Sequence, residues 1–201
     1  TGQRMGEMID RYSTLLAASP PSMVAVFGDV DSTLAAAYAG KRMHLPVAHV
    51  EAGLRSFDMD MPEEINRLMV DSIADLLITT TEAAGENLLA EGRAPGQIHY
   101  AGNLMIDSLR ETRERPDWVS LSREVRERYE VVEGRYALAT FHRPSNVDAR
   151  THLAQVAQLL EEASRHMPIV FPVHPRSHAA FERHGVRIPQ QVKVLPPLRY
   201  A

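Results

Sequence analysis

Residues 45–67 read LPVAHVEAGLRSFDMDMPEEINR, and this stretch decides the fold class. Its apolar start predicts a strand at 47–50, a glycine turn follows, and Pro62 is a residue type favoured at the first position of a helix. Carboxylates stand at the predicted strand end, Glu51, and again at the predicted helix start, Glu63. Carboxylates that are held close together shift each other's pKa and take part in proton chemistry. The stretch therefore indicates both an α/β fold and an active site.

The same alternation continues on both sides of this stretch. Apolar strands are predicted at 23–27, 47–50, 76–79, 98–101, 136–140, 169–173 and 192–195. Helices are predicted at 2–17, 33–41, 63–74, 82–91, 105–113, 121–129, 149–165 and 179–184. In the helix at 149–165, one buried stripe is predicted from helical spacing, made of Leu153, Val156, Leu159 and Leu160. Strands and helices that alternate with right-handed crossovers build parallel sheets, so the predicted fold is α/β and doubly wound.

A charged segment broken by a proline, at 111–117, interrupts this pattern. Such segments commonly join domains. We therefore predict a first domain at 1–115 and a second at 116–201.

The composition excludes several classes of protein. The 201 residues are 44% hydrophobic and 24% charged with a net charge of −4 and no basic tract, so no nucleic-acid partner is expected. The absence of cysteine excludes disulfides and thiol catalysis. No apolar run approaches the ~18 residues of a membrane span, and a cytoplasmic location is predicted. There is no metal-ligand spacing, GxGxxG or P-loop, so neither a metal nor NAD is expected.

Charged or titratable residues follow four of the predicted strands: Asp29, Glu51, His142 with Arg143, and His174. In open α/β sheets, ligands bind beyond the carboxyl ends of the strands. Two of these strand ends come from each side of the predicted boundary, which predicts a cleft between the domains. Carboxylates on one side and phosphate-binding His and Arg on the other suit an anionic, nucleotide-linked substrate whose reaction moves protons.

Structural alternatives exist for several of these residues. Asp29 can cap the following helix, and one of Glu63 and Glu64 can simply stabilise a helix dipole. His49 lies just before a strand end, where a structural histidine is the commoner finding. The pair His142-Arg143 has little structural purpose at a strand end, while both side chains can hold a phosphate.

Seven blocks of sequence stand in one order along the chain. They are Gly28-Asp29, residues 49–55 (HVEAGLR), residues 62–67 (PEEINR), Thr81-Glu82, Gly102-Asn103 with Ile106-Asp107, Thr140 with His142-Arg143, and His174-Pro175. In these blocks the chain resembles the non-hydrolysing UDP-N-acetylglucosamine 2-epimerase family, over about residues 20–198. HVEAGLR followed by PEEINR is long and chemically unusual, so the resemblance is specific.

The resemblance implies two Rossmann-like domains in the GT-B arrangement, each present here in part. It implies interconversion of UDP-GlcNAc and UDP-ManNAc through elimination of UDP to a 2-acetamidoglucal and its re-addition. It also implies a homodimer and no cofactor. Two other activities stay open: a hydrolysing relative that releases UDP and ManNAc, and a non-catalytic nucleotide-sugar-binding or glycosyltransferase protein of the same architecture.

Carried over by position, the resemblance assigns catalytic roles to Asp29, Glu51, Glu63 and His142. The three carboxylates would remove and return the C2 proton, and His142 would stabilise the departing UDP. Substrate binding is assigned to Arg67, Arg143, Asn146 and His174.

The chain departs from the family pattern in one loop and at its ends. Residues 142–146 read HRPSN where many members carry HRREN, which weakens the expectation of activation by a second UDP-GlcNAc. The opening strand of the family and its DSGGxQEE block lie outside residues 1–201. We therefore expect a piece of a longer chain, inactive by itself, with an active parent.

Overall fold

The computed structural model describes residues 2–198, without the side chains of Pro144 and Ser145. The chain forms two compact units, Thr1–Leu109 and Arg110–Ala201, and each is described by itself. The division falls inside helix α5 (Leu104–Glu114), which precedes the boundary predicted between residues 115 and 116.

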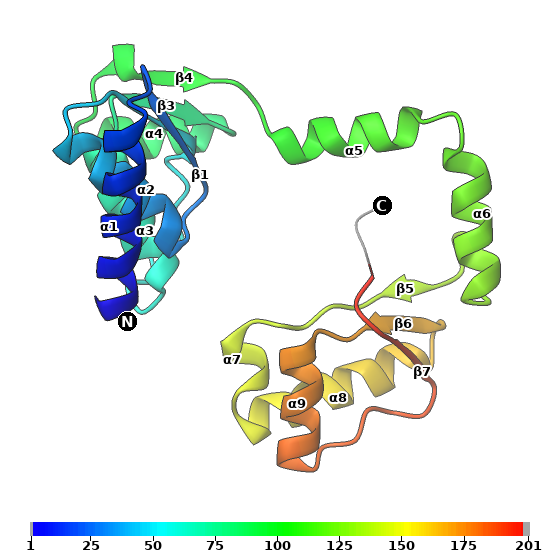
Figure 1. The fold of residues 1–201 in the computed structure, drawn as a ribbon. Helices are drawn as coiled ribbons and strands as arrows, with labels where there is room; N and C mark the ends of the chain where they lie inside the picture. The colour runs from blue at the N-terminus through cyan, green and yellow to red at the C-terminus, as the bar shows by residue number, and fades with distance from the viewer. Residues whose placement is uncertain (1, 199–201) are drawn as a thin grey trace. The chain divides into compact units, whose positions relative to one another are not determined.

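The first unit contains a parallel sheet of four strands in the order β1-β2-β3-β4 (Figure 1). The strands are β1 (Val24–Phe27), β2 (Val47–Ala52), β3 (Leu76–Thr79) and β4 (Ile98–Tyr100). The helices are α1 (Gly2–Ala18), α2 (Asp31–Arg42), α3 (Pro62–Ile73) and α4 (Glu82–Ala90), with a short 3-10 helix, η1 (Pro95–Gln97). Because Phe27 pairs with Val50 in the register of β1 and β2, the segments that follow these two strands begin side by side.

Apolar side chains of the sheet and its helices form the core of this unit. Val47 and Leu77 of the sheet are fully buried against Val70 of α3 and Leu88 of α4. Burying each of these side chains contributes about 1.5–3 kcal/mol. The core therefore holds α3 and α4 against the strands whose ends carry the predicted carboxylates.

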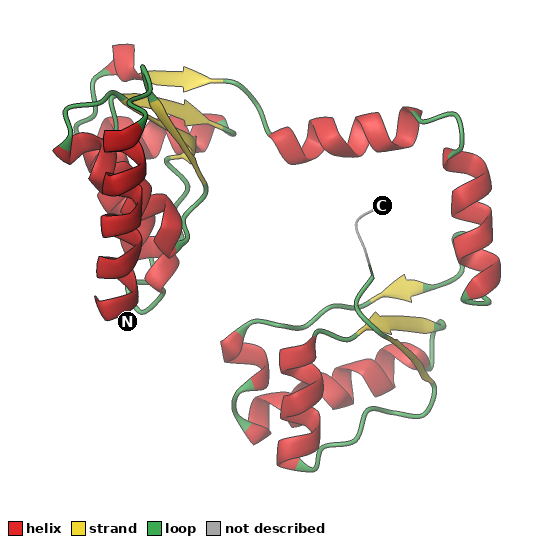
Figure 2. Cartoon of the chain, in the orientation of Figure 1, coloured by secondary structure: helices red, strands yellow, loops and turns green. Residues whose placement is uncertain are grey.

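The second unit contains a parallel sheet of three strands in the order β5-β6-β7 (Figure 2). The strands are β5 (Ala137–Leu138), β6 (Ile169–Pro172) and β7 (Val192–Leu195). The helices are α6 (Trp118–Arg128), α7 (Pro144–Val147), α8 (Arg150–Ser164) and α9 (Pro175–His184). Phe171 lies at the centre of the core and makes edge-to-face contacts with Phe141 and Phe181.

All seven predicted strands are present, and each predicted helix overlaps an observed one. Helix α9 begins at Pro175, four residues before the predicted start at 179, because His174 caps it and Pro175 occupies its first position. The predicted stripe of α8 was wrong in one member. Leu153, Val156 and Leu160 are buried, but Leu159 is 57% exposed, because adjacent residues of a helix point about 100° apart.

Helix α7 was not predicted, and β5 is shorter than the predicted strand at 136–140. Four residues are too few for a helical period to show in the sequence. None of the described helices is both long and apolar enough to cross a membrane.

Candidate active site

The segment after β1 is held by polar side chains from two helices. Gly28 adopts a left-handed conformation with φ 64°, which carries the chain into Asp29. The Thr33 hydroxyl donates to the Phe27 carbonyl at 2.7 Å, and Asn66 Nδ2 donates to the Asp29 carbonyl at 2.9 Å. Asp29 does not cap the next helix, since the N-cap position of α2 belongs to Val30 and has no side-chain capping bond. The Asp29 carboxylate instead accepts from Arg67 Nη2 at 2.5 Å.

Glu51 lies in an irregularity at the end of β2. The register with β3 shifts between Val50 and Ala52, and Glu51 has a left-handed φ of 72°. For a residue other than glycine, this conformation costs about 1–2 kcal/mol. A Cβ placed on Gly28 would lie 3.7 Å from Glu51 Oε2, so the carboxylate lies against the Gly28 backbone beside Asp29. Among the side chains that the structure describes, the Glu51 carboxylate has no hydrogen-bond or ion-pair partner.

The two glutamates at the start of α3 have different surroundings. Glu64 is 1% exposed and accepts from the Ser56 amide and hydroxyl, both at 2.9 Å, and from the Phe57 amide at 3.0 Å. Burial by itself would raise the pKa of Glu64, but these bonds and the charge of Arg67 outweigh it and lower the pKa below its ordinary value. Glu64 is therefore a structural residue that holds the loop between β2 and α3.

Glu63, by contrast, is exposed and lines a polar cavity of about 350 Å³ with Asp31, Asn66 and Arg4. Its carboxylate has no ion-pair partner within the described part of the chain. The next helical turn of α3 carries Arg67, which holds Asp29. Glu63 therefore belongs to the same end of the sheet as Asp29.

Arg67 is committed to carboxylates of the protein itself. Its side chain is 13% exposed, and it bridges Asp29 and Glu64, the latter at 3.2 Å. Its Nε is buried and has no partner among the described atoms. Arg67 thus fixes the position of Asp29, and its assignment to substrate binding stays a prediction.

In the second unit, two histidines lie together at the carboxyl ends of β5 and β6. The ring centroids of His142 and His174 are 5.7 Å apart, with 37° between the ring planes. His174 caps α9, because its Nδ1 accepts from the Arg176 amide at 3.2 Å. In a neutral ring the proton then sits on Nε2, which is left as a donor. The buried Ser177 hydroxyl donates to the Phe141 carbonyl, directly before His142.

The other predicted residues of this unit differ in how they are held. Arg143 is exposed, and in the described chain its guanidinium has no acceptor. Asn146 is half-buried in α7, and its backbone N–H donates to the Arg143 carbonyl at 3.0 Å. Arg176 is already paired with Asp148, with bonds of 2.7 and 3.1 Å. Of these two arginines, Arg143 is therefore the one whose guanidinium is free for a ligand.

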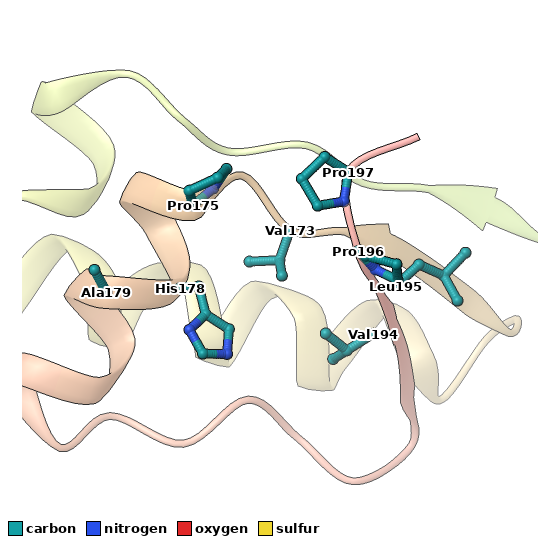
Figure 3. Close-up of a pocket in the computed structure, with 8 residues that line it drawn as sticks. All are labelled: Val173, Pro175, His178, Ala179, Val194, Leu195, Pro196 and Pro197. Carbon is teal, nitrogen blue, oxygen red and sulfur yellow. The ribbon is translucent and has the colours of Figure 1, made fainter. Parts of the chain in front are cut away.

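An apolar cavity of about 430 Å³ lies at the carboxyl ends of β6 and β7 (Figure 3). Its walls come from the segment before α9, from α9 itself and from the segment after β7. They include Val173, Pro175, His178, Val194, Leu195 and Pro197. A flat apolar group has room there.

The structure thus places the predicted residues in two groups, each at the carboxyl end of its own sheet. Asp29, Glu51, Glu63 and Arg67 form the group of the first unit, and His142, Arg143, Asn146 and His174 that of the second. In the part of the chain that the structure describes, no three His, Asp or Glu side chains come together as a metal site.

Two buried residues of the first unit were not predicted to serve the site: Asp71 and Glu64. With Arg67 they follow the spacing i, i+3, i+7, which places all three on one face of α3. A polar face on a helix that is otherwise amphipathic is the signal that could have found them.

A parallel α/β fold with polar side chains gathered at the strand ends defines a ligand-binding protein of the doubly wound class. The family model described as UDP-N-acetylglucosamine 2-epimerase matches residues 1–201. The chain therefore belongs to the UDP-N-acetylglucosamine 2-epimerase family, as its sequence motifs predicted.

Known relatives agree with this assignment. The chain is 37% identical, over 99% of its length, to the UDP-2,3-diacetamido-2,3-dideoxy-D-glucuronate 2-epimerase of Pseudomonas aeruginosa, and covers 54% of that protein. It is 36% identical, again over 99%, to a UDP-N-acetylglucosamine 2-epimerase homolog of Methanococcus maripaludis, of which it covers 56%. The chain thus spans about half the length of these relatives.

A solved structure confirms the fold class. The UDP-GlcNAc 2-epimerase of Methanocaldococcus jannaschii, in complex with UDP-GlcNAc and UDP, matches 99% of the chain with a TM-score of 0.81 and 32% identity. The match covers 56% of that protein. The predicted Rossmann-like α/β domains of GT-B type, each present in part, are therefore confirmed.

Proposed function

We propose that this protein is a non-hydrolysing UDP-N-acetylglucosamine 2-epimerase that interconverts UDP-GlcNAc and UDP-ManNAc by inverting C2. Family membership supports the reaction class. The observation that carries the proposal is the pair of carboxylates Glu51 and Glu63, which have no partner within residues 2–198 and belong to the sheet end that holds Asp29. Carboxylates left free at a binding site are suited to proton transfer.

The proposed reaction begins with removal of the C2 proton by a carboxylate. The electron pair of the C2–H bond forms the C1=C2 double bond, and the bond from C1 to the UDP oxygen breaks. The proton then returns to the opposite face of C2 while UDP adds again at C1. Glu51 and Glu63 are the better candidates for the two proton transfers, because one oxygen of Asp29 is engaged by Arg67.

The second unit supplies groups suited to the leaving UDP. Arg143 and the His174 Nε2–H can donate to diphosphate oxygens, and His142 lies beside His174. Donors placed where negative charge develops lower the barrier to departure of UDP. The apolar cavity at the carboxyl ends of β6 and β7 suits the uracil ring. Because the chain spans about half the length of its relatives, we propose that residues 1–201 alone do not turn over substrate.

Proton NMR of UDP-GlcNAc in deuterated buffer with the full-length protein tests the proposal. Loss of the C2 proton signal together with growth of UDP-ManNAc is expected. If free UDP and ManNAc form in equal amounts, the protein catalyses the hydrolysing reaction and the proposed one is wrong. If UDP-GlcNAc binds and its spectrum does not change, the protein is a non-catalytic nucleotide-sugar-binding protein and the proposed reaction is wrong.

A second substrate is favoured by one feature of the first unit. Arg4 lines the cavity that contains Glu63 and has no ion-pair partner in the described chain, so a carboxylate on the sugar would meet a cation there. The Pseudomonas aeruginosa relative is named for such a sugar, a UDP-linked 2,3-diacetamido glucuronate. Comparison of kcat/KM for the two UDP-sugars decides between them.

A further inference from the structure

A histidine and an aspartate are buried together behind the carboxylates of the first unit. His49 is 0% exposed and Asp71 is 1% exposed, and His49 Nδ1 lies 2.6 Å from Asp71 Oδ1. His49 Nε2 lies 2.8 Å from the Gly28 carbonyl, which can only accept, so Nε2 carries a hydrogen and donates it. Both ring nitrogens are therefore used inside the protein, and neither is free to meet a substrate.

The second oxygen of Asp71 holds the chain on the other side of Glu51. Asp71 Oδ2 accepts from the Gly53 amide at 3.0 Å and from Arg55 Nη1 at 2.8 Å. The Asp71 carboxylate thus bonds to His49, two positions before Glu51, and to Gly53, two positions after it. The Arg55 side chain is 1% exposed and also pairs with Glu91, with bonds of 2.7 and 2.6 Å. Burial of Arg55 opposes its charge, but its bonds to Glu91 and Asp71 outweigh burial and raise its pKa.

Glu51 needs such support because of its backbone. A left-handed φ in a residue other than glycine persists only where the surrounding structure imposes it. Gly53 adds a further constraint, since its φ is 79° and a Cβ there would lie 2.2 Å from the Ala84 carbonyl oxygen. The Gly53 carbonyl also accepts from Asn87 Nδ2 at 2.9 Å.

His49 connects this support to the other carboxylate. The carbonyl that it holds belongs to Gly28, the residue before Asp29, and the Glu51 carboxylate lies against the same glycine. A shift of His49 or Asp71 would therefore move Glu51 relative to Asp29.

We propose that His49 and Asp71 form a positioning pair, which holds Glu51 in its left-handed conformation and fixes its place beside Asp29. The pair touches no substrate and acts through the backbone at Gly28 and Gly53. The inference rests on the proposed function in taking Glu51 as a reacting carboxylate.

The test is Asp71→Asn in the full-length protein. An amide of the same shape has one acceptor oxygen, so it cannot accept from His49, Gly53 and Arg55 together. The rate of C2 proton exchange, as kcat, is expected to fall about 100-fold through misplacement of Glu51. KM is expected to change little, since the residues assigned to UDP lie in the other unit. A purely structural role would lower the melting temperature and leave kcat unchanged, which would overturn the proposal.

Asp75→Asn is the matched control. Asp75 accepts from the Val47 amide at 2.8 Å and from Lys41 at 2.7 and 2.9 Å, so it makes the same kinds of bond at the opposite end of β2. This variant is expected to lose stability and keep kcat. An equal loss of kcat in both variants would show a general effect of unfolding and overturn the specific role of Asp71.

His49→Gln provides a milder second variant if Asp71→Asn fails to fold. A crystal structure of either variant gives a readout that does not depend on turnover. Glu51 is expected to leave the left-handed region or to move away from Gly28. If Glu51 does not move and keeps a φ near 72°, the positioning role of His49 and Asp71 is overturned. This readout holds even if the wild-type protein exchanges no C2 proton. Absence of exchange in the wild-type protein would by itself defeat only the proposed function.

Discussion

The two units hold their polar residues in different ways. In the first unit, buried side chains of α3 fix the strand ends, and Arg67, Glu64 and Asp71 all bond to the segments that carry Asp29 and Glu51. In the second unit, His142, Arg143 and His174 are exposed. Their segments are held by the Ser177 hydroxyl, the backbone amide of Asn146 and the helix cap of His174. A misplaced proton-transfer group lowers the rate steeply, whereas His and Arg donors can act on a phosphate through charge-assisted hydrogen bonds. The buried partners of the first unit and the exposed side chains of the second suit the positioning and binding roles that we propose for them.

The largest effect is expected from Glu51→Gln, which removes the proposed base and keeps its shape. The rate of C2 exchange should fall about 1000-fold, within the range found for general acid–base groups, while binding of UDP is retained. Deuterium incorporation measures the rate, and Glu86→Gln on the exposed face of α4 is the control. Full activity of Glu51→Gln would break the assignment of proton chemistry to the first unit.

His142→Ala should give the next largest effect. Loss of one donor near the leaving diphosphate is expected to lower kcat about 100-fold. His142→Ala should also bind UDP more weakly, whereas Glu51→Gln in the first unit should keep its affinity for UDP. Isothermal titration with UDP measures that binding, and unchanged affinity together with unchanged kcat would remove His142 from the site.

Glu64→Gln should destabilise the first unit by about 2 kcal/mol at pH 7, since it removes a charged acceptor from buried donors. Because the pKa of Glu64 is lowered in the folded protein, its contribution is present above the unfolded value of 4.5 and is lost as the pH falls through the folded pKa. The difference in unfolding free energy between wild type and variant should therefore shrink below about pH 4.5. Urea unfolding at several pH values measures it, and a constant difference would contradict the role of the charge.

Ser177→Ala should have the smallest effect, a loss of about 1 kcal/mol for one neutral hydrogen bond. Its specific consequence is a looser segment before His142, which is expected to appear as a higher KM for UDP-GlcNAc. Ser164→Ala is the control, because that exposed hydroxyl also donates to a carbonyl, that of Glu161. Equal KM values in the two variants would show that Ser177 serves the core alone.

The choice between Glu63 and Glu64 shows where prediction from sequence ended. The pair at the start of a helix was recognised, and one of the two was expected to be structural. Which one depends on the loop between β2 and α3, whose amides at Ser56 and Phe57 point at Glu64. A loop conformation of this kind is not encoded in any periodic pattern, so neighbouring acids cannot be told apart beforehand.

By itself the sequence determined the alternation of strands and helices and the polar residues that end each strand, because both follow from local spacing and composition. It also determined the family, through the long blocks around Glu51 and Glu63. Tertiary structure alone decided that Arg67 serves Asp29, 38 residues away, and that Asp71 and His49 hold Glu51 in a strained conformation. These contacts join α3 to Asp29, which follows β1, and to His49 in β2. Burial strengthens them, and a sequence does not display burial.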